Sequence, residues 1–423
     1  AGSERGLIDA GVLANALLKA GRIAEAEQTL RDGITTSVTQ GNYRLASVYA
    51  GNLLNLLRGD GRFPEALTLA ADKAEYTRRA GLGPWTQLAD EAMRLQVLVD
   101  MGKYDAVLAR VAELRPQLET LPEQSAAAET ANPWNVREGL LDTGRSAAMR
   151  SEQWAQALAF NGDIRRYQAA RGADALELAR TRFNDYGPLL RLQRYAEARA
   201  LLHDCRAVEE QHRDPVGLGK VYSALADLED TVGERATAVQ FEQTALRYRY
   251  QAGAPDDCAF SHGNIANYLE RLGRDHALVI AHRLATSLIF IQIQSGQLPV
   301  SIRHLQNTAL PAAPPAFAEV AALVEQIPGV QFRALFARLP QTFPSGDAAI
   351  ATVWQLAQQE KAKGEQSAAM QQQVLAAMPQ AIQDAFELDG EAFRQAMGAA
   401  LSAMPENEAM SIINQLRQAG LIG

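Results

Sequence analysis

Residues 52–66 read NLLNLLRGDGRFPEA, and this stretch decides the fold of the chain. It places a Leu four residues before a Gly, an apolar residue two places after that Gly and an Ala five places after it: Leu57, Gly61, Phe63 and Ala66. Most of these features recur in seven copies, which begin at Gly21, Gly61, Gly102, Glu152, Gln193, Gly233 and Gly273. The intervals between the copies are 40, 41, 50, 41, 40 and 40 residues, so we predict a repeat protein.

Each copy is typical of a turn between two antiparallel helices. The Gly ends the first helix where the backbone needs a positive φ angle. The apolar residue fills the gap between the two helices, and the Ala lets their axes approach closely. Because one hairpin cannot bury both of its apolar faces, neighbouring hairpins must stack. The predicted fold class is therefore all-α, a superhelix of hairpins with a concave inner face.

The distribution of these turns divides the chain into three regions. Residues 1–310 hold about seven hairpins and a degenerate further one that opens at Gly296. A Pro-rich linker at 311–316 separates them from residues 317–423, where short helical patterns predict a small C-terminal helical module or an extended cap. The longest interval contains the sequence PEQSAAAETANP at 122–133, which we expect to be a surface loop.

The turns, with apolar residues at helical spacing on either side, resemble tetratricopeptide repeats over residues 5–310. The period of 40 to 41 residues is longer than the usual one of about 34. It is more similar to the long-helix variants found in kinesin light chains and in the sensor regions of bacterial signal-transducing NTPases. The resemblance implies a right-handed superhelix and a non-catalytic module that binds a peptide or protein segment. We expect it to be the sensor or scaffold part of a larger bacterial regulator.

Asparagines recur at two positions on the first helix of several hairpins. Counted back from the turn, one position is shared by Asn52, Asn184 and Asn264, and another, three residues later, by Asn15, Asn55 and Asn267. Residues i and i+3 lie on one helical face. The resemblance implies that this face lines the inner groove, where asparagine amides bind the backbone of an extended peptide. An Asn side chain suits this role because it offers one acceptor and two donors.

Three further residues register on the same inner face and complete the predicted peptide-binding set: Gln96, Arg180 and Lys220. The two basic residues would meet a carboxylate of the ligand, as they do in chaperone-binding members of the family. Two alternatives to ligand binding stay open. In the first, Arg180 and Lys220 simply belong to a solvated helix face. In the second, the asparagines form hydrogen bonds to neighbouring helices, and Gly51 and Gly263 are packing notches.

Composition and missing motifs exclude several other classes of function. The formal net charge of −8, without a basic run, argues against a nucleic-acid partner. No stretch approaches the roughly 18 apolar residues that span a bilayer, so no membrane partner is expected. The six histidines never fall at i, i+4, and neither HExxH nor GxSxG occurs, so we predict no enzyme, no metal and no cofactor.

Cysteine usage and the chain's opening bear on its location. With two cysteines there is no disulfide framework, and the first residues carry neither a signal-peptide pattern nor an initiator Met. We therefore expect a cytoplasmic protein cut from a longer chain. The alternative to peptide binding is an architectural role, with self-association through the apolar residues 284–293 or through the C-terminal module; the oligomeric state stays open.

Overall fold

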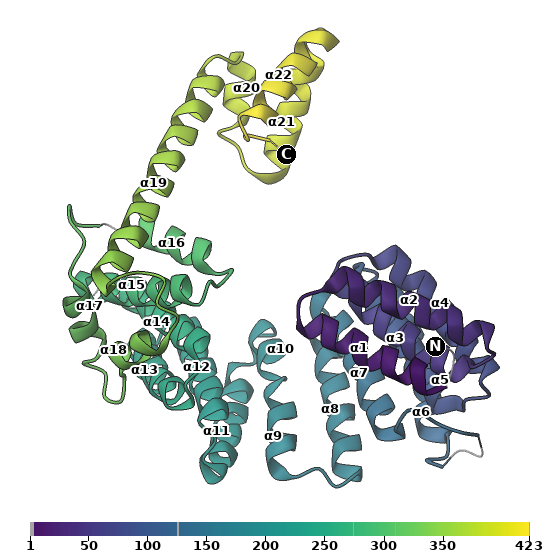
Figure 1. The fold of residues 1–423 in the computed structure, drawn as a ribbon. Helices are drawn as coiled ribbons and strands as arrows, with labels where there is room; N and C mark the ends of the chain where they lie inside the picture. The colour runs from purple at the N-terminus through teal and green to yellow at the C-terminus, as the bar shows by residue number, and fades with distance from the viewer. Residues whose placement is uncertain (1–3, 125–126, 274, 309, 423) are drawn as a thin grey trace. The chain divides into compact units, whose positions relative to one another are not determined.

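The structure is a computed structural model, and it describes residues 4–124, 127–273, 275–308 and 310–422. Over these ranges the chain forms 22 helices and no β-strand; an isolated bridge joins Leu82 and Ala128 (Figure 1). The all-α prediction is confirmed. Part of the chain's opening, on which the expectation of a longer chain rests, lies outside the described residues.

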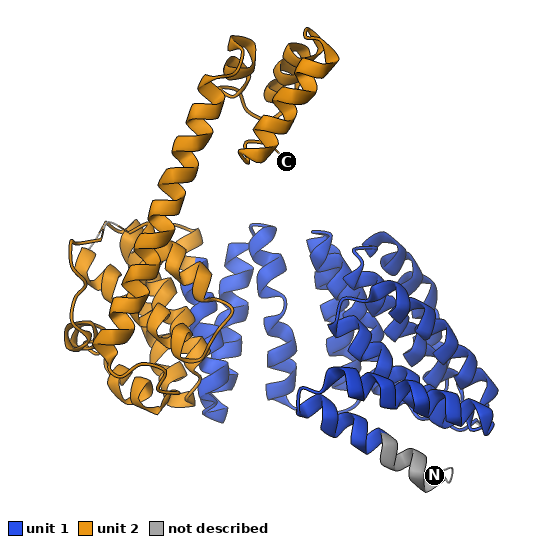
Figure 2. Cartoon of the chain, turned by 45° about the horizontal axis from the view of Figure 1, so that its top comes forward, with its two compact units in different colours: residues 1–228 blue, residues 229–423 orange. Residues whose placement is uncertain are grey.

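The chain divides into two compact units, residues 1–228 and 229–423, with the boundary inside α12 (Figure 2). The helices of the first unit are α1 (Glu4–Lys19), α2 (Ile23–Thr39), α3 (Tyr43–Gly59), α4 (Phe63–Arg79), α5 (Pro84–Asp100), α6 (Tyr104–Thr120), α7 (Pro133–Arg150), α8 (Trp154–Ala170), α9 (Ala175–Phe183), α10 (Tyr186–Arg191), α11 (Tyr195–His212) and most of α12 (Pro215–Thr231). Most of them contact the next one or two helices in the chain, which is the packing of a helical solenoid.

The second unit contains the remaining helices: α13 (Arg235–Ala252), α14 (Pro255–Arg271), α15 (His276–Gln292), α16 (Leu298–Gln306), α17 (Phe317–Val324), α18 (Phe332–Arg338), α19 (Gly346–Ala376), α20 (Gln380–Ala385), α21 (Gly390–Ser402) and α22 (Glu406–Gln418). Helices α17 and α19, which follow the Pro-rich stretch, pack against α15, and α19 also packs against α16. The predicted boundary at 311–316 stays a prediction, because the division that the structure shows falls at Leu228 and Glu229.

Helices throughout the repeats end on a residue with positive φ. The five glycines that open the predicted turns adopt it, at Gly21, Gly61, Gly102, Gly233 and Gly273. Where the turn has another residue the backbone is the same: φ is 60° at Glu152 and 58° at Gln193. The connections between hairpins use the same conformation at Gly41, Gly81, Gly172, Arg213, Gly253 and Gln294. The sequence pattern therefore marks one of two equivalent turns in most repeats; α6 instead ends at Leu121, where the backbone is extended.

Replacing Glu152 or Gln193 by Gly is expected to stabilise the first unit. A side chain in the left-handed region costs about 1–2 kcal/mol, part of which Gly loses again through its freedom in the unfolded chain. The expected net gain is roughly 0.5–1 kcal/mol for each variant, measured by urea denaturation. Ala80→Gly is the control, because the end of α4 has a φ of −73°; it should destabilise. A lower stability for both Glu152→Gly and Gln193→Gly would contradict the argument.

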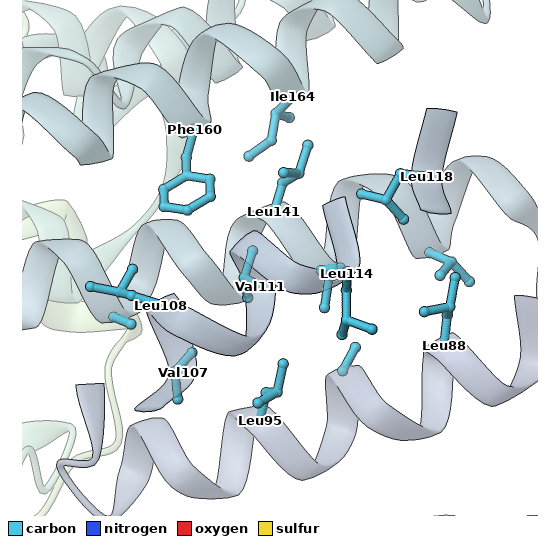
Figure 3. Packing of buried hydrophobic residues seen from close by; sticks show 14 of the residues in the cluster. Leu88, Leu95, Val107, Leu108, Val111, Leu114, Leu118, Leu141, Phe160 and Ile164 are labelled. Carbon is cyan, nitrogen blue, oxygen red and sulfur yellow. The ribbon is translucent and has the colours of Figure 1, made fainter. Parts of the chain in front are cut away.

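The alanines five places after the turn lie in the protein interior. All five are fully buried: Ala26, Ala66, Ala157, Ala198 and Ala238. The apolar residues of the turn are only half-buried, and Ile23 is 45% exposed, so they cover the helix junction more than they fill it. One core cluster of the first unit comes from α5, α6, α7 and α8, where leucines and valines interdigitate with Phe160 and Ile164 (Figure 3).

The loop predicted at 122–133 is mostly exposed, and several hydrogen bonds hold it against α5 and the residues just before that helix; residues 125 and 126 lie outside the described residues. The Glu129 carboxylate accepts hydrogen bonds from the backbone N–H of Thr86, at 2.9 Å, and of Trp85, at 3.2 Å. The Trp85 indole donates to the Pro122 carbonyl at 2.7 Å. Because an acidic side chain at a helix N-terminus satisfies free N–H groups and the helix dipole, the insertion also caps α5.

The apolar helix proposed for self-association is already covered by its own chain. Helix α15 is buried along almost its whole length, and Leu284, Leu288 and Ile289 have no exposed surface. It contacts α14, α16, α17 and α19. Residues 284–293 therefore supply a core, and that route to self-association is wrong. In the C-terminal segment, by contrast, every side chain between residues 361 and 370 of α19 is exposed.

Candidate functional site

The predicted groove residues line three pockets or lie at separate places; the one in the third pocket is Gln96. Asn15 and Asn55 are exposed on α1 and α3, and Asn52 is half-buried on α3. Gln96 lies on α5 and accepts a hydrogen bond at 2.9 Å from Arg58, whose guanidinium also binds Asp100. Its amide oxygen is therefore engaged within the protein.

Three predicted residues meet in one hollow of the first unit. Arg180 from α9, Asn184 from the end of α9 and Lys220 from α12 line a cavity of about 700 Å³. We call it the unit 1 pocket; its other lining residues are Phe183, Glu209, Asp214, Val216, Gly217 and Val221. The repeat register alone had placed the three residues on a common face, and the structure brings them to one cavity.

The helix that carries Asn184 is interrupted at that residue. Sequence register placed Asn184 inside a first helix, yet α9 ends at Phe183 and α10 begins at Tyr186. Pro188, four residues after Asn184, has no N–H to donate to the Asn184 carbonyl, and its ring clashes with that carbonyl. Asn184 becomes the C-terminal cap of α9, with its N–H bonded to Thr181. Its exposed side chain therefore extends from a helix end.

Arg180 is paired with carboxylates of its own chain. Its Nη2 donates to the Asp214 carboxylate at 2.7 Å, and its Nε lies 3.6 Å from Glu209 Oε1. That Arg180 also meets a ligand carboxylate stays a prediction. Lys220 is exposed and makes no ion pair within the part of the chain that the structure describes. It is the available cation of the unit 1 pocket.

A buried carboxyl group forms the floor of this pocket. The Glu209 side chain is 4% exposed, and burial raises its pKa while Arg180 lowers it. Its Oε2 has no hydrogen-bond partner within the protein. A Cβ at Gly217 would lie 2.2 Å from the Glu209 carboxylate, so this carboxylate packs directly against the α12 backbone at Gly217.

The second unit has its own pocket, with two more of the predicted asparagines. Asn264 and Asn267 on α14 line a cavity of about 120 Å³ together with Arg283 of α15 and His304 of α16. We call this the unit 2 pocket; Ala259, Phe260, Gly263, Thr286, Phe290, Gln297, Val300 and Ser301 complete it. Among these residues Phe260 and Phe290 are in ring contact and Arg283 binds Asn267, so the lining has an apolar part and a polar part.

Arg283 is the charged centre of the unit 2 pocket, and sequence reasoning missed it. It donates to the Asn267 amide oxygen at 2.8 Å and to the Glu270 carboxylate at 2.8 Å. Its side chain is 5% exposed, and burial lowers its pKa. Arg283 is the one Lys, Arg, Asp or Glu in the 17 residues of α15. A single charged residue in an otherwise apolar helix was the sequence signal that could have identified Arg283 as a site residue.

The glycines just before Asn52 and Asn264 help to decide between the two explanations that the sequence left open, ligand binding and helix packing. A Cβ at Gly51 would lie 3.0 Å from Cε of Lys73, so Gly51 is a packing notch for that buried side chain. A Cβ at Gly263 would meet only Thr286, at 3.6 Å, which is an ordinary contact. Packing therefore explains Gly51, whereas Gly263 borders an open cavity.

General features of the chain limit other kinds of site. Across the described ranges, no three His, Cys, Asp or Glu side chains are placed to share a metal ion. Among those same residues, none of the helices reaches the length and hydropathy that a bilayer-spanning segment requires. Compared with models of protein families and with curated proteins, the chain finds no match to either.

Proposed function

We propose that this chain is a non-catalytic interaction module, built from long-period tetratricopeptide-type repeats, that binds a peptide or protein segment. The unit 1 pocket is the main contact. One observation carries the proposal: Arg180, Asn184 and Lys220, which the repeat register predicts on one inner face, line a single cavity. Register positions that face a common ligand are what a repeat protein uses for binding.

The chemistry of the pocket suits a short extended segment. A cavity of about 700 Å³ is within the range of ligand sites, roughly 300–1,000 Å³. The exposed Asn184 amide matches a peptide unit, because it both donates and accepts. Lys220, which is exposed, meets a carboxylate of the segment. Val216, which is 45% exposed, offers an apolar contact beside these polar groups.

A binding role without catalysis fits the groups in both pockets. Ser301 and His304 line the unit 2 pocket, but the Ser301 hydroxyl donates to the Leu298 carbonyl at 2.8 Å instead of to the histidine. Such an arrangement lacks the base that activates a nucleophile. A cytoplasmic location agrees with Cys205 and Cys258, which are both free thiols in buried positions.

Removing the pocket's available amide and cation is expected to weaken binding at least tenfold. The probes are peptides selected from a random phage-displayed library on the intact chain, and fluorescence anisotropy measures their affinity for Asn184→Ala/Lys220→Ala. Each lost charged or polar contact is worth about 1 kcal/mol or more at a desolvated interface. Both side chains are exposed, so the fold should tolerate their loss.

The matched control is Lys361→Ala/Asn414→Ala, which removes the same two chemical groups from exposed helical sites on α19 and α22. It should leave the affinity of the selected peptides unchanged. Equal affinity of all three proteins would remove the pocket from the proposal. Failure to select any peptide on the wild-type chain would contradict the function itself.

A further inference from the structure

We propose that the unit 2 pocket binds a small carboxylic acid whose other end is an aromatic ring or a branched aliphatic group. This proposal is independent of the proposed function, because it concerns a different cavity, of a different size, formed by α14, α15 and α16. Four properties of the pocket lead to this class of ligand.

The first property is size. A cavity of about 120 Å³ is comparable to apolar cavities of about 150 Å³ that hold one benzene molecule. One ring or a short branched chain therefore fills it. An extended peptide segment of several residues does not fit inside.

The second property is an apolar wall that the protein leaves uncovered. Phe260 is 44% exposed and Val300 is 41% exposed, although both are large apolar side chains. They come from α14 and α16 and line the same cavity. Phe260 packs against buried Phe290 in an edge-to-face arrangement, with the ring centroids 5.3 Å apart. An apolar ligand would cover these surfaces and remove them from water.

The third property is the charge of the polar wall. Arg283 is the charged residue of the lining, and no Asp or Glu is among the lining residues. His304 also lines the cavity, but burial lowers its pKa, so it donates or accepts hydrogen bonds there as a neutral ring. Glu270 pairs with Arg283 but is not one of these residues. Arg283 uses one N–H on Asn267 and another on Glu270, and its buried Nε has no partner within the protein. The wall therefore favours an anion, and a carboxylate is the anion that a guanidinium and amides bind best.

The fourth property is open backbone space at Gly263. Helix interiors rarely keep Gly, because Ala is about 1 kcal/mol more favourable there. A Cβ at Gly263 would make only ordinary contacts, with Thr286, so the packing of α14 does not require Gly. The position lines the cavity, and a methyl group there would occupy space that a ligand needs.

The test is isothermal titration calorimetry of the intact chain with phenylacetate and isovalerate. For ligands of this size we expect dissociation constants on the order of 0.1–1 mM. Phenylacetamide has the same shape without the charge, and benzylamine presents the opposite charge. Both should bind at least about tenfold more weakly, because the pocket offers a cation and no acidic side chain.

Three variants connect the binding to this pocket. Gly263→Ala should raise the thermal stability of the chain and weaken phenylacetate binding at least threefold, two effects of opposite sign that misfolding does not produce. Phe260→Ala removes the exposed ring and should weaken binding about tenfold. Met410→Ala is the control, because it removes a half-exposed apolar side chain from α22, away from the pocket-lining residues.

Three results would overturn the proposal. One is no heat of binding for either acid up to 10-fold above the expected range, about 10 mM. The second is equal affinity for phenylacetate and phenylacetamide, which would remove the carboxylate from the ligand. The third is a peptide ending in Phe that binds at least tenfold more tightly than phenylacetate and loses this advantage as its C-terminal amide, which would make the ligand a chain terminus instead of a free acid.

Discussion

Asp90→Leu is expected to destabilise the first unit by about 3–5 kcal/mol, because it leaves a buried ammonium group without its counter-charge. Asp90 of α5 forms an ion pair with Lys73 of α4, and their side chains are 2% and 11% exposed. Lys73 Nζ also donates to the Ser47 hydroxyl at 3.2 Å, and Ser47 is bonded to Thr77 at 2.8 Å. These hydroxyl groups cannot neutralise the lysine.

The double variant Lys73→Met/Asp90→Leu separates the charge from the packing. Replacing both members of a buried pair by apolar residues of similar volume is often neutral or stabilising. Here Asp90 Oδ2 is buried without a hydrogen-bond partner, so the pair is not fully satisfied. We expect the double variant to recover most of the loss in urea denaturation, followed through its first transition. A loss below about 1 kcal/mol for Asp90→Leu would mean that the ammonium reaches water.

This ion pair also shows where sequence reasoning ends. Lys73 and Asp90 occupy the second helix of one repeat and the first helix of the next, in stretches that read as ordinary amphipathic helices. Of the residues around this pair, only Gly51, opposite Lys73, has a sequence signal, which one alternative above gave as a packing notch. The turn residues were predictable because backbone geometry acts within a few neighbouring residues. The buried partners were not, because they depend on how one hairpin docks on the next.

The repeat register of the asparagines predicted their positions only in part, because it too depends on local backbone geometry. Asn264 and Asn267 lie three residues apart on one helix, so the sequence was sufficient to place them on one face of α14. For Asn184 the distance from the turn predicted a position inside a helix, although Pro188, a helix-breaking signal, is visible in the sequence. Arg283 and His304 reach the unit 2 pocket from other helices, and no local pattern predicts that convergence.

Acidification is expected to destabilise the second unit through two buried histidines. The rings of His262 and His282 lie side by side, with their Nδ1 atoms 2.8 Å apart, and the Tyr250 hydroxyl is 2.9 Å from His262 Nε2. One Nδ1 must donate and the other must accept, so both rings cannot be protonated in this geometry. Burial lowers the pKa of His282 to about 3, and burial together with His282 lowers the pKa of His262.

The sign of the effect follows from these directions. In the unfolded chain a histidine binds a proton below a pH of about 6.5, whereas the folded unit keeps both rings neutral. Their contribution to stability is complete above that pH and is lost as the pH falls from 6.5 toward the folded pKa. For His282 alone the loss between pH 7 and pH 5 is about 2 kcal/mol. The pair together loses up to roughly twice that amount.

His282→Gln tests this in the window from pH 6.5 to 5, above the range in which most carboxylates titrate. It should lower stability at pH 7 and also flatten the pH dependence by about 1.4 kcal/mol per pH unit. His212→Gln, at the exposed end of α11, should leave that slope unchanged. Hydrogen exchange in α14 and α15 is the suitable measurement, because it reports on the second unit by itself.

The measurement must report on the second unit alone, because the first unit contains groups whose protonation has the opposite effect on stability. Burial raises the pKa of Asp185 and of Glu209, so acid protonates these carboxyl groups more readily in the folded state and stabilises the unit that contains them. A whole-chain transition would mix the two effects. If exchange in α14 and α15 had the same pH dependence in the wild type and in His282→Gln, the ring would already be protonated in the folded protein, and its contact with His262 would have to be rearranged.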